Sequence, residues 1–210
     1  MSASLLSQHP RGSCPMKKLK KLGQGGGCWV MSTKYLEEIF QIPDKVNVRF
    51  DGKSLVFEGA KGRVIKDISH IPAEVKIADG KIVFRVPGKS RKAKALLGTL
   101  VSIARNAAIG VTKGYVYKMK VVSSHFPITV KVVGGEVHIT NFIGEKYVRR
   151  AKIVGDVKVQ VKGDEIIITG VDRESVGQTA ANIENATRIP RKDPRKFLDG
   201  IYVMEKAVGE

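Results

Sequence analysis

Apolar residues alternate with polar ones in four pairs of short segments between residues 46 and 168. In the first pair, Val46 and Val48 precede Asp51-Gly52, and Leu55 and Phe57 follow it. Such spacing around a glycine-containing turn is typical of a β-hairpin. The other three turns are Asp79-Gly80, Gly134-Gly135 and Gly163-Asp164, flanked by Val75, Ile77, Ile82, Phe84, Val130, Val132, Val137, Ile139, Val157, Val159, Ile166 and Ile168. The pattern therefore predicts four hairpins.

Two further segments have the period of an amphipathic helix. Their apolar positions are Ala93, Leu96, Leu97, Leu100, Ile103, Ala104 and Ala107 in the first, and Val176, Ala180, Ile183 and Ala186 in the second. Ser90 and Asp172 are the expected N-caps, and Gly110 is expected just beyond the end of the first helix. A shorter helical stretch is predicted at Ser32–Phe40.

These elements form one motif that occurs twice, with a period of about 82–84 residues, which is too long for a solenoid repeat and suits a duplicated domain. Ile42-Pro43 opens the first copy and Phe126-Pro127 the second. We predict an α+β fold of two tandem duplicated domains, each an antiparallel sheet with a helix packed on one face. The expected boundaries are 31–114, a linker at 115–125 with 111–122 as a candidate strand, and 126–210.

Residues 1–30 differ in composition from the rest of the chain. They contain no acid, but they hold both cysteines, the only tryptophan and five Lys or Arg residues. We expect a disordered basic extension. Three origins compete: a basic tail for RNA, an organelle-targeting peptide, or upstream translation of non-coding sequence with the true start at Met31. We favour the last, because the composition shifts abruptly there.

The net charge of +17, from 37 Lys+Arg against 20 Asp+Glu, predicts an anionic partner such as nucleic acid. Aromatic residues make up only 6%, which favours contacts to backbone phosphates of structured RNA over base reading or single-strand binding. The cations gather in two clusters, namely Lys89, Arg91, Lys92 and Lys94 at the first helix, and Arg188, Arg191, Lys192, Arg195 and Lys196 before a last strand at Ile201–Val203. Pro190 and Pro194 keep the second cluster out of a helix.

The sequence contains no convincing catalytic constellation, so we predict no enzyme, no cofactor and no metal. His70, His125 and His138 have no metal-binding spacing. Gly88-Lys89-Ser90 is similar to the end of a P-loop, but Val83 stands where that loop needs its first glycine. The rival hypothesis is an enzyme that acts on a phosphorylated substrate at this segment. Nucleotide-induced thermal stabilisation, lost on Lys89→Ala, would support it. No run approaches the ~18 apolar residues of a membrane span, so no membrane partner is expected.

The C-terminal part resembles the signature of the large-subunit ribosomal protein L6 family, in its archaeal and eukaryotic branch. The residues that carry the resemblance are 178–184, 186–188 and 195–202, and it extends from about Met31 to the end. It implies a structural constituent of the large ribosomal subunit in the cytoplasm, with large-subunit rRNA and neighbouring ribosomal proteins as partners and no small-molecule substrate. The resemblance also implies binding mainly through the second domain, near the sarcin–ricin loop and the docking site of translational GTPases.

The resemblance and the charge clusters together define the candidate rRNA-binding residues. They are Gln178, Asn182, Arg188, Arg191, Lys192, Arg195, Lys196 and Lys206, with Lys89, Arg91, Lys92 and Lys94 as lesser candidates. Gln178 and Asn182 lie one helical turn apart and are expected on the same side of the helix. The alternative function is a free RNA- or DNA-binding module outside the ribosome, which would stay at the top of a sucrose gradient.

Overall fold

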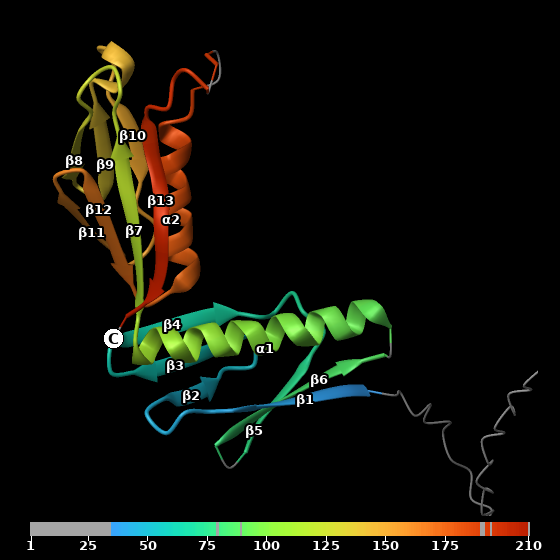
Figure 1. Cartoon of the computed structure of the whole chain (residues 1–210). Coiled ribbons are helices and arrows are strands. Elements are labelled where there is room, and N and C mark those ends of the chain that lie inside the picture. Colours follow the sequence, from blue (N-terminus) through green and yellow to red (C-terminus); the bar gives the residue numbers. More distant parts are fainter. Residues whose placement is uncertain (1–34, 79, 89, 190–191, 194, 210) are drawn as a thin grey trace, which may run out of the picture. The chain divides into compact units, whose positions relative to one another are not determined.

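The computed structural model describes residues 35–78, 80–88, 90–189, 192–193 and 195–209 (Figure 1). The expected extension at 1–30, with its three explanations, lies outside these residues, as do Lys89 and Arg191. The fold is α+β, and the same strand-and-helix motif occurs twice, as predicted. The paired strands run antiparallel to one another.

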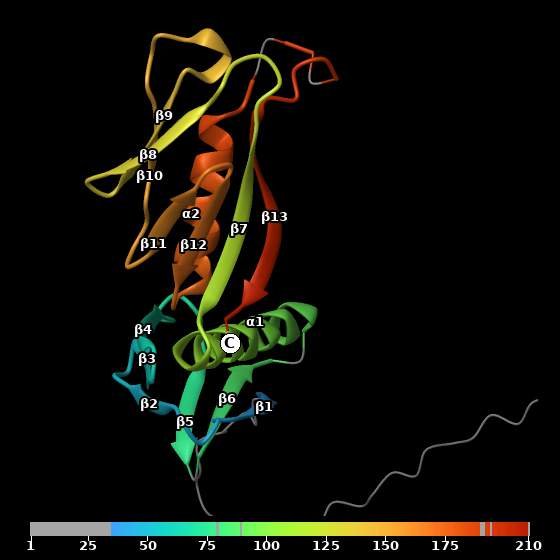
Figure 2. The same ribbon diagram turned by 60° about the vertical axis from the view of Figure 1, so that its left-hand side comes forward.

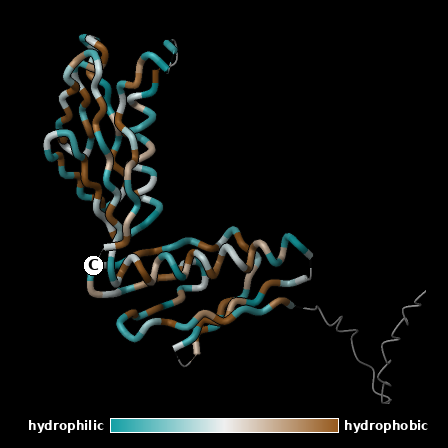
Figure 3. Tube along the Cα trace, viewed as in Figure 1, coloured by the Kyte–Doolittle hydropathy of each residue, from teal (hydrophilic) through white to brown (hydrophobic). Residues whose placement is uncertain are grey.

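The first copy contains six strands followed by one helix. These are β1 (Tyr35–Gln41), β2 (Asn47–Phe50), β3 (Ser54–Gly59), β4 (Gly62–Asp67), β5 (Glu74–Ala78), β6 (Lys81–Pro87) and α1 (Arg91–Thr112). The strands form two sheets in the orders β1-β6-β5 and β2-β3-β4. Both hairpins predicted for this copy, β2–β3 and β5–β6, are confirmed. Apolar residues recur along these strands (Figure 3), and the buried ones form the first core together with buried residues of α1.

The helix predicted at Ser32–Phe40 is wrong over its described part, which is the edge strand β1. All seven of its residues pair with β6, for example Ile39 with Val83. Leu36, Ile39 and Phe40 have local helical spacing, but only Leu36 and Phe40 pack on the core, while Ile39 is exposed. The backbone pairing with β6, more than forty residues away, decides the structure, and local periodicity does not show it.

Helix α1 begins as predicted but ends later than predicted. The Ser90 hydroxyl accepts a hydrogen bond from the Ala93 N–H at 3.2 Å, which confirms the N-cap. Gly110 is inside the helix, and Gly114, with φ +75°, is the glycine beyond its end. A Cβ at position 110 would lie 2.1 Å from the Val171 carbonyl oxygen. Gly110 therefore serves a close approach of two backbones and is not a terminator.

The second copy contains seven strands, a short 3-10 turn and one helix. These are β7 (Tyr115–Val122), β8 (Thr129–Val133), β9 (Glu136–Thr140), η1 (Phe142–Gly144), β10 (Arg149–Lys152), β11 (Lys158–Lys162), β12 (Glu165–Gly170), α2 (Arg173–Ala186) and β13 (Gly200–Val208). The sheet orders are β10-β9-β8 and β11-β12-β7-β13. The segment expected as a linker thus contains β7, a central strand, whereas residues 111 and 112 of the candidate strand 111–122 are the end of α1. Both predicted hairpins, β8–β9 and β11–β12, are confirmed.

Helix α2 covers one face of the second copy (Figures 1 and 2). The Asp172 carboxylate accepts hydrogen bonds from the N–H groups of Glu174 and Ser175, both at 3.3 Å, which confirms the predicted N-cap. Val176, Ala180 and Ile183 on the inner face of the helix are buried in a second core. A helix of fourteen residues is marginal alone, so this apolar face supplies most of its stability.

Helix α1 is long and apolar enough to cross a membrane, judged by length and composition alone. The absence of a long continuous apolar run had predicted no such helix. Helix α1 is the one such helix among the described residues. However, Leu97, Leu100, Val101 and Ala104 are buried in the first core. This is the arrangement of a core helix in a folded domain, so the hydropathy of α1 is weak evidence for a membrane span.

Candidate nucleic-acid interface

Three loops of the second copy meet at one end of its sheets (Figures 1 and 2). We call residues 123–128, 141–148 and the described part of the third loop, which comprises 187–189, 192–193 and 195–199, the loop end. The Asn141 side-chain amide donates to the Pro127 carbonyl oxygen at 3.0 Å and joins the first two loops. A Cβ at Gly144 would touch the Phe126 ring at 3.3 Å. The third loop, between α2 and β13, carries the C-terminal basic cluster.

Arg149 at the start of β10 holds the end of α2. Its Nη1 donates to the carbonyl oxygens of Ala186, at 2.8 Å, and Arg188, at 3.1 Å. Its Nε and Nη2 donate to the two carboxylate oxygens of Glu145, at 2.9 and 2.8 Å, and this bidentate pair lowers the pKa of Glu145. The guanidinium also lies 4.4 Å from the centre of the Phe142 ring. One side chain thus satisfies two carbonyls where the helix passes into the basic loop.

Asp199 ties the far end of the basic loop to the β7–β8 loop. Its side chain is only 2% exposed and accepts hydrogen bonds from the backbone N–H groups of Ser124 and His125. The His125 Nδ1 lies 2.7 Å from the other carboxylate oxygen. Burial alone would raise the pKa of Asp199, but these hydrogen bonds outweigh it and hold the pKa below its usual value.

Four further contacts fix the shape of the basic loop. The His125 ring stacks on Phe197, with centroids 4.9 Å apart, and the Lys192 ammonium lies 4.4 Å from the same Phe197 ring. The buried Thr187 hydroxyl donates to the Glu184 carbonyl at 3.0 Å and accepts from the Ile201 N–H at 3.2 Å. The loop is therefore fastened where it leaves α2 and where it enters β13.

Positive side chains dominate the outer surface of this loop. The exposed cations that the structure describes are Arg188, Lys192, Arg195 and Lys196. Asp193 uses one carboxylate oxygen to accept the Arg195 N–H at 3.0 Å, which closes a turn. Four cations on one fastened loop form a surface that suits phosphates, because each contact releases a counterion without ordering a flexible tail.

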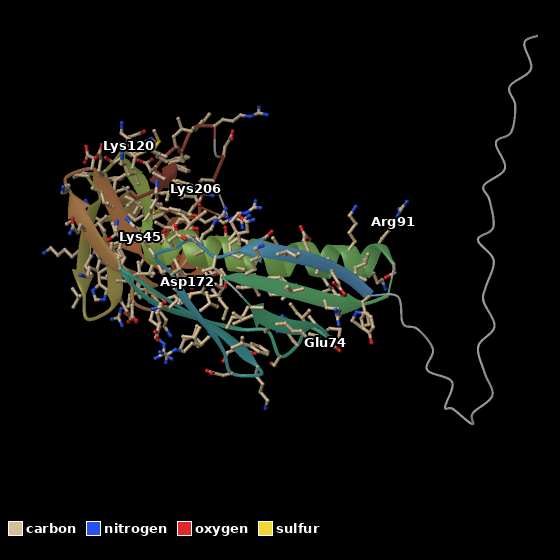
Figure 4. All side chains as sticks on the ribbon, turned by 90° about the horizontal axis from the view of Figure 1, so that it is seen from below. Lys45, Glu74, Arg91, Lys120, Asp172 and Lys206 are labelled. Carbon is tan, nitrogen blue, oxygen red and sulfur yellow. The ribbon has the colours of Figure 1, made fainter. Side chains whose placement is uncertain are left out.

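The structure places the other predicted residues away from this loop surface. Gln178 Nε2 donates to Asn182 Oδ1 at 2.9 Å, so the two share a face of α2 as predicted, and Asn182 also donates to the Lys152 carbonyl. Lys206 lies near the Tyr117 ring, about 20 Å along β13 from its start. The side chains of Arg91, Lys92 and Lys94 are exposed in the first turn of α1, where Figure 4 shows Arg91 pointing outward.

The residues that build the site were not all visible in the sequence. No sequence pattern identified Arg149 or Asp199 as part of the site. His125 had no assigned role. Each acts through a partner at least 37 residues away, and a single sequence gives no signal for such pairs. The described residues contain no group of three or more His, Cys, Asp and Glu side chains that could hold a metal ion.

Comparisons with known proteins agree with the duplicated fold. A family model described as "Ribosomal protein L6" matches residues 42–114 and again 126–200. The chain is 48% identical over 179 residues to the large ribosomal subunit protein uL6 of Sulfurisphaera tokodaii, and this alignment covers 85% of this chain and 96% of that protein. It is 45% identical over 172 residues to the protein of the same name from Methanospirillum hungatei, covering 82% and 98%.

Proposed function

The chain belongs to the ribosomal protein L6 family, and we propose on this premise that it is a structural constituent of the large ribosomal subunit. It acts in the ribosome, in the cytoplasm, with rRNA and other ribosomal proteins as partners. Its contribution is non-catalytic. The second copy holds a basic loop against folded large-subunit rRNA, and the loop cations replace the counterions of the phosphates.

The fastened basic loop is the observation that carries this proposal. Arg149, Thr187 and Asp199 satisfy polar groups at both of its ends, so the loop that carries Arg188, Lys192 and Lys196 is anchored where it leaves α2 and where it enters β13. Anchored ends reduce the conformational entropy that the loop loses on binding. A loop anchored in this way suits phosphates held at fixed positions in a folded RNA.

The finer part of the proposal concerns the place of the contact. We propose that the loop end binds near the sarcin–ricin loop, close to where translational GTPases dock. Arg91, Lys92 and Lys94 at the start of α1 are a second, weaker contact, because like charges at a helix N-terminus are unfavourable unless an anion compensates them. Gln178, Asn182 and Lys206, which the sequence placed among the main candidates, become lesser ones, because they lie away from the four loop cations.

Co-sedimentation tests the ribosomal role, and crosslinking separately tests the position of the rRNA contact. Tagged full-length protein, expressed in an archaeal host, is expected to sediment with the large subunit. Protein that remains at the top of the sucrose gradient would support the rival, a free RNA- or DNA-binding module. In isolated subunits, ultraviolet crosslinks from the peptide containing Lys192 are expected in the sarcin–ricin region. Crosslinks confined to other rRNA domains would refute the placement while leaving the ribosomal role intact.

A further inference from the structure

A cavity of about 500 Å³ opens at the loop end, between the end of α2 and the basic loop. Its lining includes two aromatic rings, Phe197 and Tyr202, together with the polar side chains of Asn185 and Arg188. The volume is within the range of small-molecule sites. The charge on the loop accounts for phosphate contacts, but it does not account for aromatic walls.

Both aromatic walls are held in place by their own contacts. Phe197 is stacked on His125, which Asp199 fixes in turn. The Tyr202 hydroxyl donates to the Leu198 carbonyl at 3.2 Å, and a Cβ at Gly200 would lie 3.0 Å from the Tyr202 ring. A glycine at position 200 therefore lets the Tyr202 ring lie close against the backbone. The Tyr202 residue is still 40% exposed, so part of its surface is open to a ligand.

The polar lining fits a neutral ring better than a phosphate. Glu184 also lines the cavity, and its carboxylate would repel a phosphate but accepts a hydrogen bond from an exocyclic amino group. The Asn185 amide can both donate and accept, as the edge of a base requires. Arg188 lines the same cavity and can reach the phosphate of the nucleotide that enters it.

We propose that this cavity receives a single unpaired nucleobase of the bound RNA. The base stacks on Tyr202, and Asn185 and Glu184 contact its edge. Unstacked bases of loops and bulges are the usual targets of base recognition in RNA, and aromatic side chains are their usual platforms. The inference rests on the proposed function and adds to it: the basic loop binds the backbone, and the cavity selects a place where one base is free.

A pair of RNA hairpins tests the proposal directly. Both hairpins have the same stem, and the second one also carries a single unpaired nucleotide. The second hairpin is prepared in four versions, one for each base at the unpaired position. The full-length protein is expected to bind at least one bulged hairpin about tenfold more tightly than the paired one, because base–aromatic stacking has that size. Tyr202→Ala is expected to abolish this preference while leaving the affinity for the paired hairpin unchanged.

Three further variants separate a lost contact from a lost fold. Tyr202→Phe keeps the ring and is expected to retain the preference. Asn185→Ala is expected to reduce the discrimination among the four bulged bases. Tyr35→Ala removes an aromatic residue of the first copy that is 41% exposed, lies outside the loop end and does not line the cavity, so this variant should bind like wild type.

The outcomes distinguish this proposal from the function on which it rests. Equal binding of paired and bulged hairpins by the wild-type protein overturns the base cavity. A Tyr202→Ala variant that keeps its cooperative unfolding and the full preference overturns it too. If the wild-type protein binds neither the hairpins nor a large-subunit rRNA transcript, the rRNA-binding function itself is refuted.

Discussion

Lys66 of the first copy and Asp172 of the second form an ion pair, with Lys66 Nζ 2.8 Å from the Asp172 carboxylate. The same ammonium lies 2.6 Å from Glu174. Asp172 is the N-cap of α2, and Glu174 lies in the first turn of that helix. A lysine on β4 of one copy therefore completes the start of a helix in the other copy, and it does so where negative charge favours the helix dipole.

Replacing Lys66 by methionine is expected to lower the free energy of unfolding at pH 7 by about 1–2 kcal/mol, since a largely buried charged hydrogen bond is lost. Burial would raise the pKa of Asp172, but hydrogen bonds from Lys66 and Ser175 lower it. Because the pKa of Asp172 is lower in the folded state than in the unfolded state, its ionised carboxylate stabilises the fold at pH values above the unfolded-state pKa. This stabilisation is lost as the pH falls through the folded-state pKa. The difference between wild type and variant should therefore shrink below about pH 4.

Urea unfolding between pH 3 and pH 8 measures this effect. Lys118→Met is the control, because Lys118 pairs with Glu205 on an exposed strand and both side chains remain about half exposed. The control should change stability little at any pH. A Lys66→Met variant as stable as wild type at pH 7 would contradict the role given to this ion pair.

Two glycines of α1 should respond oppositely to alanine. A Cβ at Gly110 would lie 2.1 Å from the Val171 carbonyl oxygen, so in Gly110→Ala the backbones of α1 and of Val171 must move apart. We expect a loss of more than about 2 kcal/mol, the size of overpacking effects. Gly98 has nothing within 4 Å of its virtual Cβ, so Gly98→Ala should stabilise the protein by about 0.5–1 kcal/mol through helix propensity. Denaturant melts of both variants measure this, and a tolerated Gly110→Ala would contradict the close approach.

Removing the Arg149 side chain should loosen the basic loop. Arg149→Met leaves the Ala186 and Arg188 carbonyls without their donor, and the expected cost is about 1–3 kcal/mol. Hydrogen exchange at residues 187–189 should accelerate, and peptides of the first copy should be unchanged. Arg150→Met, the adjacent exposed arginine, is the control. Unaltered protection of 187–189 in Arg149→Met would show that the loop does not depend on this contact.

Much of the fold could be predicted from short-range patterns because its hairpins are local. Alternating apolar residues around a glycine turn specify both strands at once, and all four hairpins formed as expected. Strands β4 and β10 were missed because each has only one buried residue, Val64 and Ala151, among exposed or half-buried neighbours. Strand β1 was mistaken for a helix because its partner β6 follows it only forty or more residues later. Such strands are determined by pairing rather than by their own periodicity.

The candidate site was predictable in its charge but not in its construction. The run of cations after α2 is visible in the sequence, and its two prolines exclude a helix. The supports of the loop are long-range contacts: Arg149 reaches Ala186, and His125 reaches Asp199. The sequence also favoured phosphate contacts alone, since aromatic residues are few. Composition cannot show that two of those few, Phe197 and Tyr202, line one cavity.

The salt dependence of rRNA binding measures how many phosphates the four loop cations contact. Affinity for a large-subunit rRNA transcript is measured between about 50 and 200 mM salt for wild type and for a variant with Arg188, Lys192, Arg195 and Lys196 changed to glutamine. Each phosphate contact contributes about −0.7 to −0.9 to the slope of log affinity against log salt, so the variant's slope should be about three units shallower. A control with Lys45, Lys53, Lys76 and Lys81 of the first copy changed to glutamine should keep the wild-type slope. An unchanged slope in the loop variant would contradict the account.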